Sequence, residues 1–517
     1  MGETRMSETS IGSLYTMIIV CFSLTSLGSI TSLEDSVNSG WGTAAPIGSD
    51  DSGSALYPQV AVDDSGNAMV VWQQYDGVRN NIWSNRFTVE AGWGEAALLE
   101  TNNSGDAVKP QIAVDNSGNA TAVWQQDNGT RYCIYSNRYV VGTGWGSAKL
   151  IESNDSEGAF NPQIAVDDSG NATVVWEQDD GIYDDSIHSN RYTVGTGWGS
   201  ATLIGGTANY YWDEHAVDPK VAVDGSGNAM AVWMQYGFNW GSVWSNRYEA
   251  GTGWGTASLI ETGTCVLLAA EPEVAVDDSG NAISVWSGAD NFRHCILSSR
   301  YVVGMGWGDP TLVEVADTGD NFFPHIAADA SGNAMVVWQQ REEPFPGIAE
   351  SGVMANRYVA GTGWQTATIV EECSSGMIGH PGVAVNEWGN AMAVWERIDG
   401  NRTSICSSRY GFETGWGPSV SIGTSAPLNA GNPQVAIDDS GNAMVVWWQY
   451  DGTSFDIWSN RYVEPETSLS SSHTSIVTVF AILAVGVSIA AISFYWIRKK
   501  KGDRSGELTE EKPPPRS

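Results

Sequence analysis

The sequence predicts an all-β protein, an eight-bladed β-propeller of four-stranded antiparallel blades closed by an N-terminal outer strand, followed by one C-terminal transmembrane helix. Three observations predict this architecture. The stretch VAVDDSGNAMVVW at 60–72 returns seven more times, at intervals of 52, 52, 57, 53, 52, 57 and 52 residues. Each repeat contains short β-rich runs separated by turns, and one end of the array carries a strand that the other end lacks. A fixed period of this size indicates an array of similar supersecondary units.

The second repeat, 109–152, illustrates the four strands of one blade. PQIAVD, NATAVWQQ, CIYSNRYVV and SAKLIE are separated by DNSGN, DNGT and GTGWG. Gly, Asn and Asp accept the positive φ that tight hairpins require, so each break predicts a turn between antiparallel strands. The third strand places large apolar groups on both faces, as at Ile82 and Trp83, which fits a sheet covered on both sides. Sheets stacked around an axis meet that need; a linear solenoid is the alternative.

The two ends of the array favour a closed ring over a solenoid. GWGTAAPIG at 40–48 is a fourth strand with no first, second or third strand before it. The last repeat stops after its third strand, DIWSNRYVE at 456–464. We therefore expect Thr43–Ile47 to pair with Ile457–Val463, which closes the ring and removes two exposed sheet edges.

Both termini carry patterns typical of membrane proteins. An apolar core at Tyr15–Leu27 follows Arg5, as in a secretory signal peptide. Ile476–Ile497 has 22 residues without a charge, enough to cross a hydrocarbon core of about 30 Å. Arg498–Lys501 follows directly, which indicates the cytoplasmic side. The predicted domains are a signal peptide (1–33), the propeller ectodomain (40–464), a Ser/Thr-rich linker (465–475), the transmembrane helix (476–497) and a cytoplasmic basic tail (498–517).

The net charge of the chain limits the classes of partner that it is expected to bind. The 517 residues carry a formal net charge of -35. Binding to a phosphate backbone needs a basic surface, so no nucleic-acid partner is expected. The predicted location is the cell membrane, with a single pass and the propeller outside. The predicted partners are the lipid bilayer, through the C-terminal helix, and an extracellular glycan or protein.

The repeat resembles known propeller families. VDDSGNAMVVW, together with IWSNRY and GTGWG, resembles the propeller repeats of microbial cell-surface proteins. Over about 40–464 it is also distantly similar to the Asp-box repeats of sialidases. Asp64-Ser65-Gly66 keeps the acidic turn of that pattern, whereas Val62 stands where the pattern has Ser, and Trp72 lies six residues past the Gly. The resemblance implies a propeller fold and, as an alternative function, a sialidase-like glycoside hydrolase.

One arginine recurs on the third strand of every blade. Third strands lie away from the axis and eight equivalent residues cannot all be catalytic, so a structural role is expected. A buried cation needs partners, and the aspartate of the DDSGN turn is the predicted one. Blade seven keeps Arg409 but offers Asn386 instead, so a neutral acceptor is expected there. The arginines are Arg86, Arg138, Arg191, Arg247, Arg300, Arg357, Arg409 and Arg461.

The acidic turns are explained by hairpin chemistry. Ca²⁺ at these turns is the alternative, since carboxylate and carbonyl oxygens are its ligands. No loop shows the full DxDxDG spacing with a distant Glu, so no metal site and no cofactor is predicted.

The predicted ligand site is on the rim formed by fourth-to-first and second-to-third loops, because function in such folds lies in the loops that differ. Blade four departs most there, with GGTANYYWDEHAVDP and QYGFNWGS. Aromatic faces flanked by polar acceptors suit sugar rings; mutual packing of these aromatics to hold a long loop is the alternative. The candidate residues are Tyr210, Tyr211, Trp212, Asp213, Glu214, His215, Phe238 and Trp240.

The cysteines favour an oxidising location. Cys265 with Cys295 in blade five, and Cys373 with Cys406 in blade seven, are predicted to form two disulfides within their blades near the variable rim, leaving Cys133 free.

No motif of a known catalytic site is present. GxSxG, HExxH and a phosphate loop are absent from the sequence, and no catalytic residue is predicted. The sequence thus favours a binding protein over an enzyme: a membrane-anchored cell-surface propeller, of adhesion type, that binds an extracellular glycan or surface protein through its variable loop rim. A structural cell-envelope protein without a discrete ligand is the third alternative.

Overall fold

The computed structural model describes residues 40–465 except for short internal ranges. The predicted signal peptide, the predicted transmembrane segment (476–497) and the predicted tail (498–517) lie outside the described residues. Within the described part, no helix is long and apolar enough to cross a membrane. The internal ranges left out are 49–52, 101–103, 154–156, 180, 182–184, 207–214, 237–240, 262–266, 291–292, 315–318, 346–347, 374–375, 401 and 425–428.

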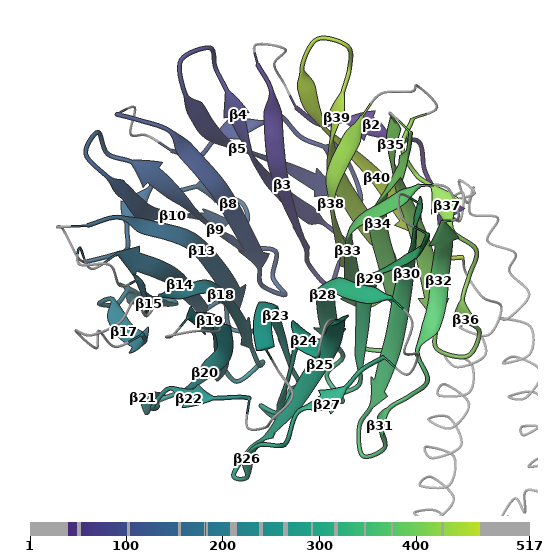
Figure 1. Cartoon of the computed structure of the whole chain (residues 1–517). Coiled ribbons are helices and arrows are strands. Elements are labelled where there is room, and N and C mark those ends of the chain that lie inside the picture. Colours follow the sequence, from purple (N-terminus) through teal and green to yellow (C-terminus); the bar gives the residue numbers. More distant parts are fainter. Residues whose placement is uncertain are drawn as a thin grey trace, which may run out of the picture. The chain divides into compact units, whose positions relative to one another are not determined.

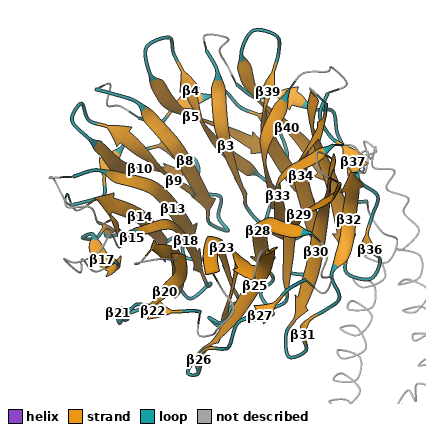
Figure 2. Cartoon of the chain, in the orientation of Figure 1, coloured by secondary structure: helices purple, strands orange, loops and turns teal. Residues whose placement is uncertain are grey.

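The described chain forms eight antiparallel sheets around a central axis (Figure 1), and Figure 2 shows only strands and loops in it. The innermost strands touch one another in a closed circle, with the first blade in contact with the eighth. The predicted eight-bladed all-β propeller is therefore confirmed. The outer strand differs in detail from its prediction, because it is divided into two short segments that both pair with the third strand.

The strands follow the same order in each blade. The innermost strands are β3 (Ala55–Val62), β8 (Ala107–Val114), β13 (Ala159–Val166), β18 (Ala216–Val223), β23 (Leu267–Val276), β28 (Asp320–Ala328), β33 (Met377–Val385) and β38 (Ala430–Ile437). The second strands are β4 (Ala68–Tyr75), β9 (Ala120–Asp127), β14 (Ala172–Asp179), β19 (Ala229–Tyr236), β24 (Ala282–Asp290), β29 (Ala334–Phe345), β34 (Ala391–Asp399) and β39 (Ala443–Tyr450). The third strands are β5 (Asn80–Thr88), β10 (Tyr132–Val140), β15 (Asp185–Thr193), β20 (Gly241–Glu249), β25 (Arg293–Val302), β30 (Ile348–Val359), β35 (Arg402–Gly411) and β40 (Phe455–Val463).

The outer segments come in pairs. They are β6 (Gly92–Trp93) with β7 (Ala97–Leu98), β11 (Gly144–Trp145) with β12 (Lys149–Leu150), β16 (Gly197–Trp198) with β17 (Thr202–Gly205), β21 (Gly253–Trp254) with β22 (Ser258–Leu259), β26 (Gly306–Trp307) with β27 (Thr311–Leu312), β31 (Gly363–Trp364) with β32 (Thr368–Cys373), β36 (Gly415–Trp416) with β37 (Val420–Ser421), and β1 (Gly40–Trp41) with β2 (Ala45–Pro46).

The hydrophobic core lies between blades. The tryptophan near the middle of each second strand, such as Trp124, is completely buried. Trp124 belongs to blade two but packs with Val71, Ile82 and Leu99 of blade one. Because a blade covers its apolar face only against its neighbour, each blade needs the next one to bury its core.

The first segment of the array closes the ring as predicted. Gly40 pairs with Val463 and Trp41 with Tyr462 in an antiparallel ladder. Farther along, Ala45 pairs with Ser459. These contacts complete the blade formed by β38, β39 and β40 with the two segments β1 and β2, which come from the other end of the chain.

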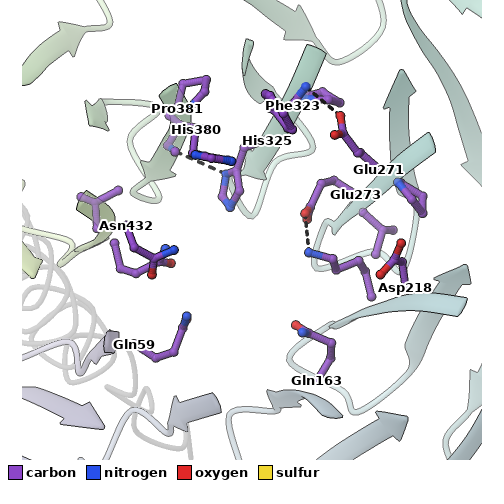
Figure 3. Close-up of a pocket in the computed structure, with 18 of the residues that line it drawn as sticks. Gln59, Gln163, Asp218, Glu271, Glu273, Phe323, His325, His380, Pro381 and Asn432 are labelled. Carbon is purple, nitrogen blue, oxygen red and sulfur yellow. Dashed lines mark hydrogen bonds and ion pairs between the residues drawn. The ribbon is translucent and has the colours of Figure 1, made fainter. Parts of the chain in front are cut away.

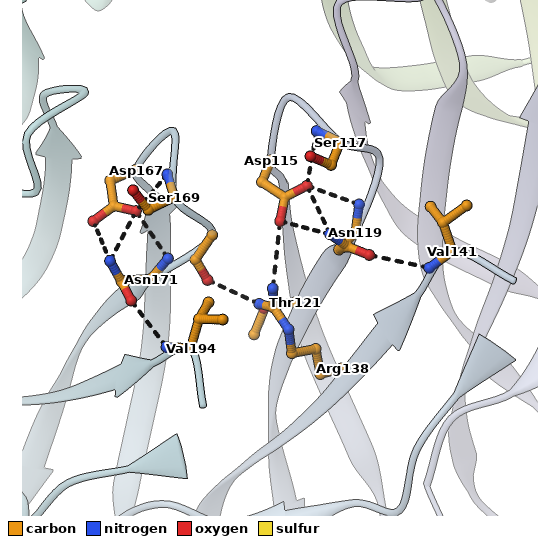
Figure 4. Close-up of polar contacts among 11 residues, drawn as sticks. Asp115, Ser117, Asn119, Thr121, Arg138, Val141, Asp167, Ser169, Asn171 and Val194 are labelled. Carbon is orange, nitrogen blue, oxygen red and sulfur yellow. Dashed lines mark hydrogen bonds and ion pairs between the residues drawn. The ribbon is translucent and has the colours of Figure 1, made fainter. Parts of the chain in front are cut away.

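The repeated aspartate builds the turn between first and second strands. In blade two, Asp115 Oδ1 accepts hydrogen bonds from the backbone amides of Ser117 (3.0 Å) and Asn119 (2.9 Å), and its Oδ2 accepts one from the Asn119 amide group (3.0 Å) (Figure 4). Asn119 Oδ1 in turn accepts from the Val141 amide (3.0 Å). The turn therefore joins the first-to-second connection to the end of the third strand, which is the hairpin role that the sequence predicts.

The recurring arginine links consecutive blades. Arg138 lies 3.3 Å from the Asp115 carboxylate of its own blade and donates to the carbonyl oxygen of Gly170 in the next blade (3.0 Å). Its guanidinium group also stacks over the Tyr192 ring of the next blade, at 4.8 Å. Gly170 has a φ of +78°, and a Cβ there would lie 2.5 Å from Asp115 Oδ2. This close approach between blades requires glycine. The same ion pair recurs in Arg191–Asp167 (3.0 Å) and Arg300–Asp277 (3.7 Å).

The arginine of blade seven has a different partner from the predicted one. Arg409 does not rely on the neutral Asn386 but lies 2.6 Å from the carboxylate of Glu464, the residue after β40. The expected neutral acceptor was wrong because the acidic partner comes from the neighbouring blade.

The predicted disulfide between Cys373 and Cys406 is also wrong. Both are free thiols, buried in one hydrophobic cluster. Cys373 ends β32, the outer segment of blade six, where it is paired opposite Ser351. Cys373 therefore belongs to blade six and not, as predicted, to blade seven. Cys295 donates to the carbonyl oxygen of Gly288 (3.4 Å), and its predicted partner Cys265 lies outside the described residues.

Candidate functional site: the axial pocket

The innermost strands share an irregularity that sequence analysis missed. Each contains a residue followed by proline, as in Asn161-Pro162-Gln163. Proline has no amide hydrogen to donate to the ladder, and the register shifts between Phe160 and Gln163. The residue before each proline adopts a positive φ, and these are the eight non-glycine residues with positive φ within the described ranges. They are Tyr57, Lys109, Asn161, Asp218, Glu271, Phe323, His380 and Asn432, with φ between 29° and 56°.

Side chains of the preceding blade hold several of these bulges. The Asn161 amide donates to Gln125 Oε1 (2.9 Å), and the Asp218 amide donates to Glu177 Oε1 (2.7 Å). Burial is the main reason that the pKa of Glu177 is raised. Non-glycine residues at positive φ cost about 1–3 kcal/mol each and cluster at ligand sites, where the surrounding structure enforces them. Eight such positions around one axis therefore mark the inner wall as a candidate site.

A cavity of about 520 Å³ lies on the axis at this level, and all eight innermost strands line it (Figure 3). Its volume is typical of small-ligand pockets. We call it the axial pocket. The residue after each proline lines it in every blade, and these residues are Gln59, Gln111, Gln163, Lys220, Glu273, His325, Gly382 and Gln434.

The wall has three chemically different sectors. Blades eight, one, two and three contribute mainly amides, such as Asn432, Gln59 and Gln163. Blades four and five contribute charged groups, and blades six and seven contribute phenylalanine and imidazole rings. The backbones of the blades are nearly equivalent while these side chains differ, so the pocket is asymmetric. An asymmetric polar wall can orient a ligand that has no eightfold symmetry.

The charged sector contains an ion pair and two further carboxylates. Lys220 Nζ lies 2.6 Å from Glu273 Oε1. Burial alone would lower the pKa of Lys220, but the carboxylates of Glu273, Asp218 and Glu271 raise it above its ordinary value. Glu271 Oε2 accepts a hydrogen bond from the Phe323 amide (2.8 Å), and burial is the main reason that the pKa of Glu271 is raised. Lys220 thus lies among three carboxylates.

The aromatic sector contains two different histidines. The rings of Phe323 and His380 are 4.8 Å apart at their centroids. A hydrogen bond to Glu396 is the main reason that the pKa of His380 is raised. Burial instead lowers the pKa of His325, and its Nδ1 accepts a hydrogen bond from the Val383 amide (3.3 Å). His325 therefore presents a neutral ring to the pocket at neutral pH.

Of the predicted rim residues, only His215 is described, and it is not among the residues that line the described pocket. Its Nδ1 lies 3.2 Å from Asp185 Oδ2 of the preceding blade. The others, 210–214 and Phe238 with Trp240, lie outside the described residues. The segment 207–214 leads directly into β18, which carries Asp218 and Lys220.

The eight arginines have no part in the axial pocket. None of the residues lining the described pocket is an arginine, because the third-strand arginines face the inter-blade contacts described above. Within the described ranges, no group of three or more His, Cys, Asp or Glu side chains is arranged to hold a metal ion.

Comparison with known proteins found solved structures that resemble the chain only distantly. No family model matches the chain, and no curated protein matches it. The leech intramolecular trans-sialidase is similar in structure with 8% identity, a TM-score of 0.36, and coverage of 82% of this chain and 94% of that one. NanB sialidase from Streptococcus pneumoniae gives 9% identity, a TM-score of 0.35, and coverage of 81% and 94%. The Penicillium chrysogenum α-L-arabinanase gives 10% identity, a TM-score of 0.38, and coverage of 59% and 92%. The described chain is an eight-bladed β-propeller, and its likeness to the sialidase and arabinanase structures is distant.

Proposed function

We propose that this protein binds a small carbohydrate in its axial pocket. The observation that carries the proposal is that eight bulged strands direct side chains that differ from blade to blade into one cavity. Glutamine and asparagine amides both donate and accept hydrogen bonds, which suits hydroxyl groups. The Phe323 and His380 rings offer flat faces beside them. A cavity of about 520 Å³ can hold one to a few sugar rings, whereas it is too small to receive the surface of a partner protein.

The sialidase alternative receives no support from the charges of the pocket. A site for an acidic sugar needs cations that face the ligand carboxylate. The pocket wall instead has three carboxylates, and Lys220 is already paired with Glu273. Among the described residues lining the pocket there is no arginine cluster.

A glycan array probed with the full-length protein in detergent tests the proposal. We expect binding to saccharides that is weakened in the double variant Gln111→Ala/Gln163→Ala and unchanged in Gln365→Ala, which alters an exposed glutamine outside the pocket. Binding that survives the double variant at full strength would place the site elsewhere, with the rim residues 210–215, Phe238 and Trp240 as the next candidates.

We also propose that the propeller is displayed outside the cell on the segment 476–497. The support is the sequence alone: an uncharged stretch followed by Arg498–Lys501, and a secretory pattern at the other end. Protease added to intact cells should remove the propeller and leave a fragment with 476–517. Full protection of the propeller would contradict this placement.

A further inference from the structure

The charged sector of the axial pocket has more carboxylates than cations. Asp218, Glu271 and Glu273 face one ammonium group, that of Lys220. The 2.6 Å contact between Lys220 and Glu273 satisfies one of the three carboxylates directly. The other two lie on neighbouring strands, β18 and β23, on the same side of the pocket (Figure 3).

Both remaining carboxylates are accessible to a ligand. The Asp218 side chain is exposed in the structure, and only its backbone amide takes part in the contact with Glu177. Glu271 uses Oε2 for the Phe323 amide. A carboxylate has two acceptor oxygens, so Oε1 of Glu271 is available for a second donor.

Like charges that lie close together destabilise one another, and the single ammonium group of Lys220 balances only one of the three carboxylates. A ligand ammonium group between Asp218 and Glu271 would supply a second cation and make charge-assisted hydrogen bonds, which are stronger than neutral ones. The amides of Gln59, Gln163 and Asn432 line other parts of the same cavity and suit the hydroxyl groups of the same ligand.

We propose that the axial pocket is selective for saccharides that carry a free amino group, and that Asp218 and Glu271 receive that group. This inference rests on the proposed carbohydrate binding. It adds the chemical class of the ligand and its orientation, with the amino group toward blades four and five and the hydroxyl groups toward the amide sector.

Calorimetry on the full-length protein in detergent tests this selectivity. The probes are tri-glucosamine, with free amino groups, and tri-N-acetylglucosamine, in which they are blocked. We expect the free amine to bind about tenfold more tightly or better, as for hydrogen bonds to charged groups. In Asp218→Asn and Glu271→Gln the preference should fall toward equality while binding of the blocked sugar persists. Asp399→Asn, an exposed carboxylate at the end of β34, is the matched control and should keep the preference.

A variant that is expected to increase the preference for the free amine distinguishes the loss of a carboxylate contact from misfolding. Lys220→Gln releases Glu273 from its ion pair, so a third carboxylate becomes available and the preference for the free amine should increase. Equal binding of the two sugars by the wild type, or an unchanged preference in Asp218→Asn and Glu271→Gln, overturns the selectivity but leaves carbohydrate binding intact. If neither probe binds and the glycan array is also blank, the proposed function itself fails and the inference fails with it.

Discussion

Arg409 of β35 lies 2.6 Å from Glu464, the residue that follows the last strand of the ring. In blade three the equivalent position is Val194, whose side chain approaches Gly170 beside the Arg138–Asp115 pair. Glu464 approaches Gly441 in the same way. In blade seven the turn has Asn386 in place of the aspartate, and the carboxylate that contacts Arg409 therefore comes from Glu464 of the following blade.

This ion pair should stabilise the end of the ring. Glu464→Gln leaves the Arg409 guanidinium without its charged partner, so we expect the free energy of unfolding to fall by about 1–3 kcal/mol. A double-mutant cycle with Arg409→Gln, followed by thermal melting, measures the coupling. Glu90→Gln, on an exposed turn, is the control and should change little. A coupling energy of zero would show that the pair does not stabilise the ring.

Ring closure depends on one buried side chain of the first segment. Ile47 is 3% exposed and packs with Trp72 of blade one and Ile457 of blade eight. Ile47→Ala should reduce the free energy of unfolding by about 2–5 kcal/mol, measured by denaturant titration. Thr43→Ala changes an exposed residue of the same segment and should cost far less. Equal effects of the two substitutions would mean that the segment adds little to closure.

Buried glutamates at the outer edge of the blades should make stability depend on pH. Burial raises the pKa of Glu100 and of Glu314 to about 7, although each accepts a hydrogen bond from the backbone of its own blade. Their folded-state pKa values exceed the unfolded value of 4.5, so the folded state binds protons more readily. The resulting stability is present below the unfolded pKa and is lost as the pH rises through about 7.

Glu100→Gln tests this dependence, because glutamine can still accept from the Ile82 amide and does not titrate. The wild type should lose stability relative to the variant between pH 5 and pH 8, by up to about 1.4 kcal/mol per pH unit. Melting temperatures at four pH values measure it. Parallel curves for the two proteins would contradict the expectation.

The first-to-second turns bring like charges together across the ring. The pKa of Glu387 is raised chiefly by Asp439, then by burial and by Asp278, Asp64 and Asp168. Because the charged form is disfavoured, Glu387→Gln should raise the melting temperature at low salt. The gain should shrink from about 0.01 M to about 1 M NaCl, as the Debye length falls from about 30 Å to about 3 Å. A gain that is independent of salt would exclude charge repulsion as its cause.

The closed ring could be predicted because the strands of each repeat can be recognised and counted in the sequence. The unmatched strand at 40–48 and the missing strand after Glu464 specify one pairing, and Gly40 opposite Val463 confirms it. The Arg138–Asp115 pair was predictable for the same reason, since the arginine recurs in every repeat and the aspartate in every repeat but that of blade seven. The partner of Arg409 was missed although a pattern existed: position 464 is acidic in the blade that follows the one lacking its aspartate.

The axial pocket was missed for a physical reason. A run such as NPQIAV is read as a regular strand whose faces alternate, yet the bulge at Asn161-Pro162 changes the register. Which side chains meet on the axis then depends on the closure of eight strands and not on any one of them. One indication was present: the residues flanking the proline vary between repeats whose other positions hardly change. Variation at fixed places in a repeated sequence points to residues free of the common packing role.

Gly40 and Val463 are neighbours in one ladder, so the chain enters and leaves the ring at the same rim. That rim holds the first-to-second turns, because the Glu464 amide donates to Asn442 Oδ1 of such a turn (3.0 Å). The pocket residues lie around the middle of the innermost strands, as Gln163 does in β13. A tether attached at either end of the ring would therefore hold it by the rim that carries the first-to-second turns and leave the opposite rim open to solvent. The protein can then be immobilised by its ends on a sensor surface without blocking access to the axial pocket from that opposite rim.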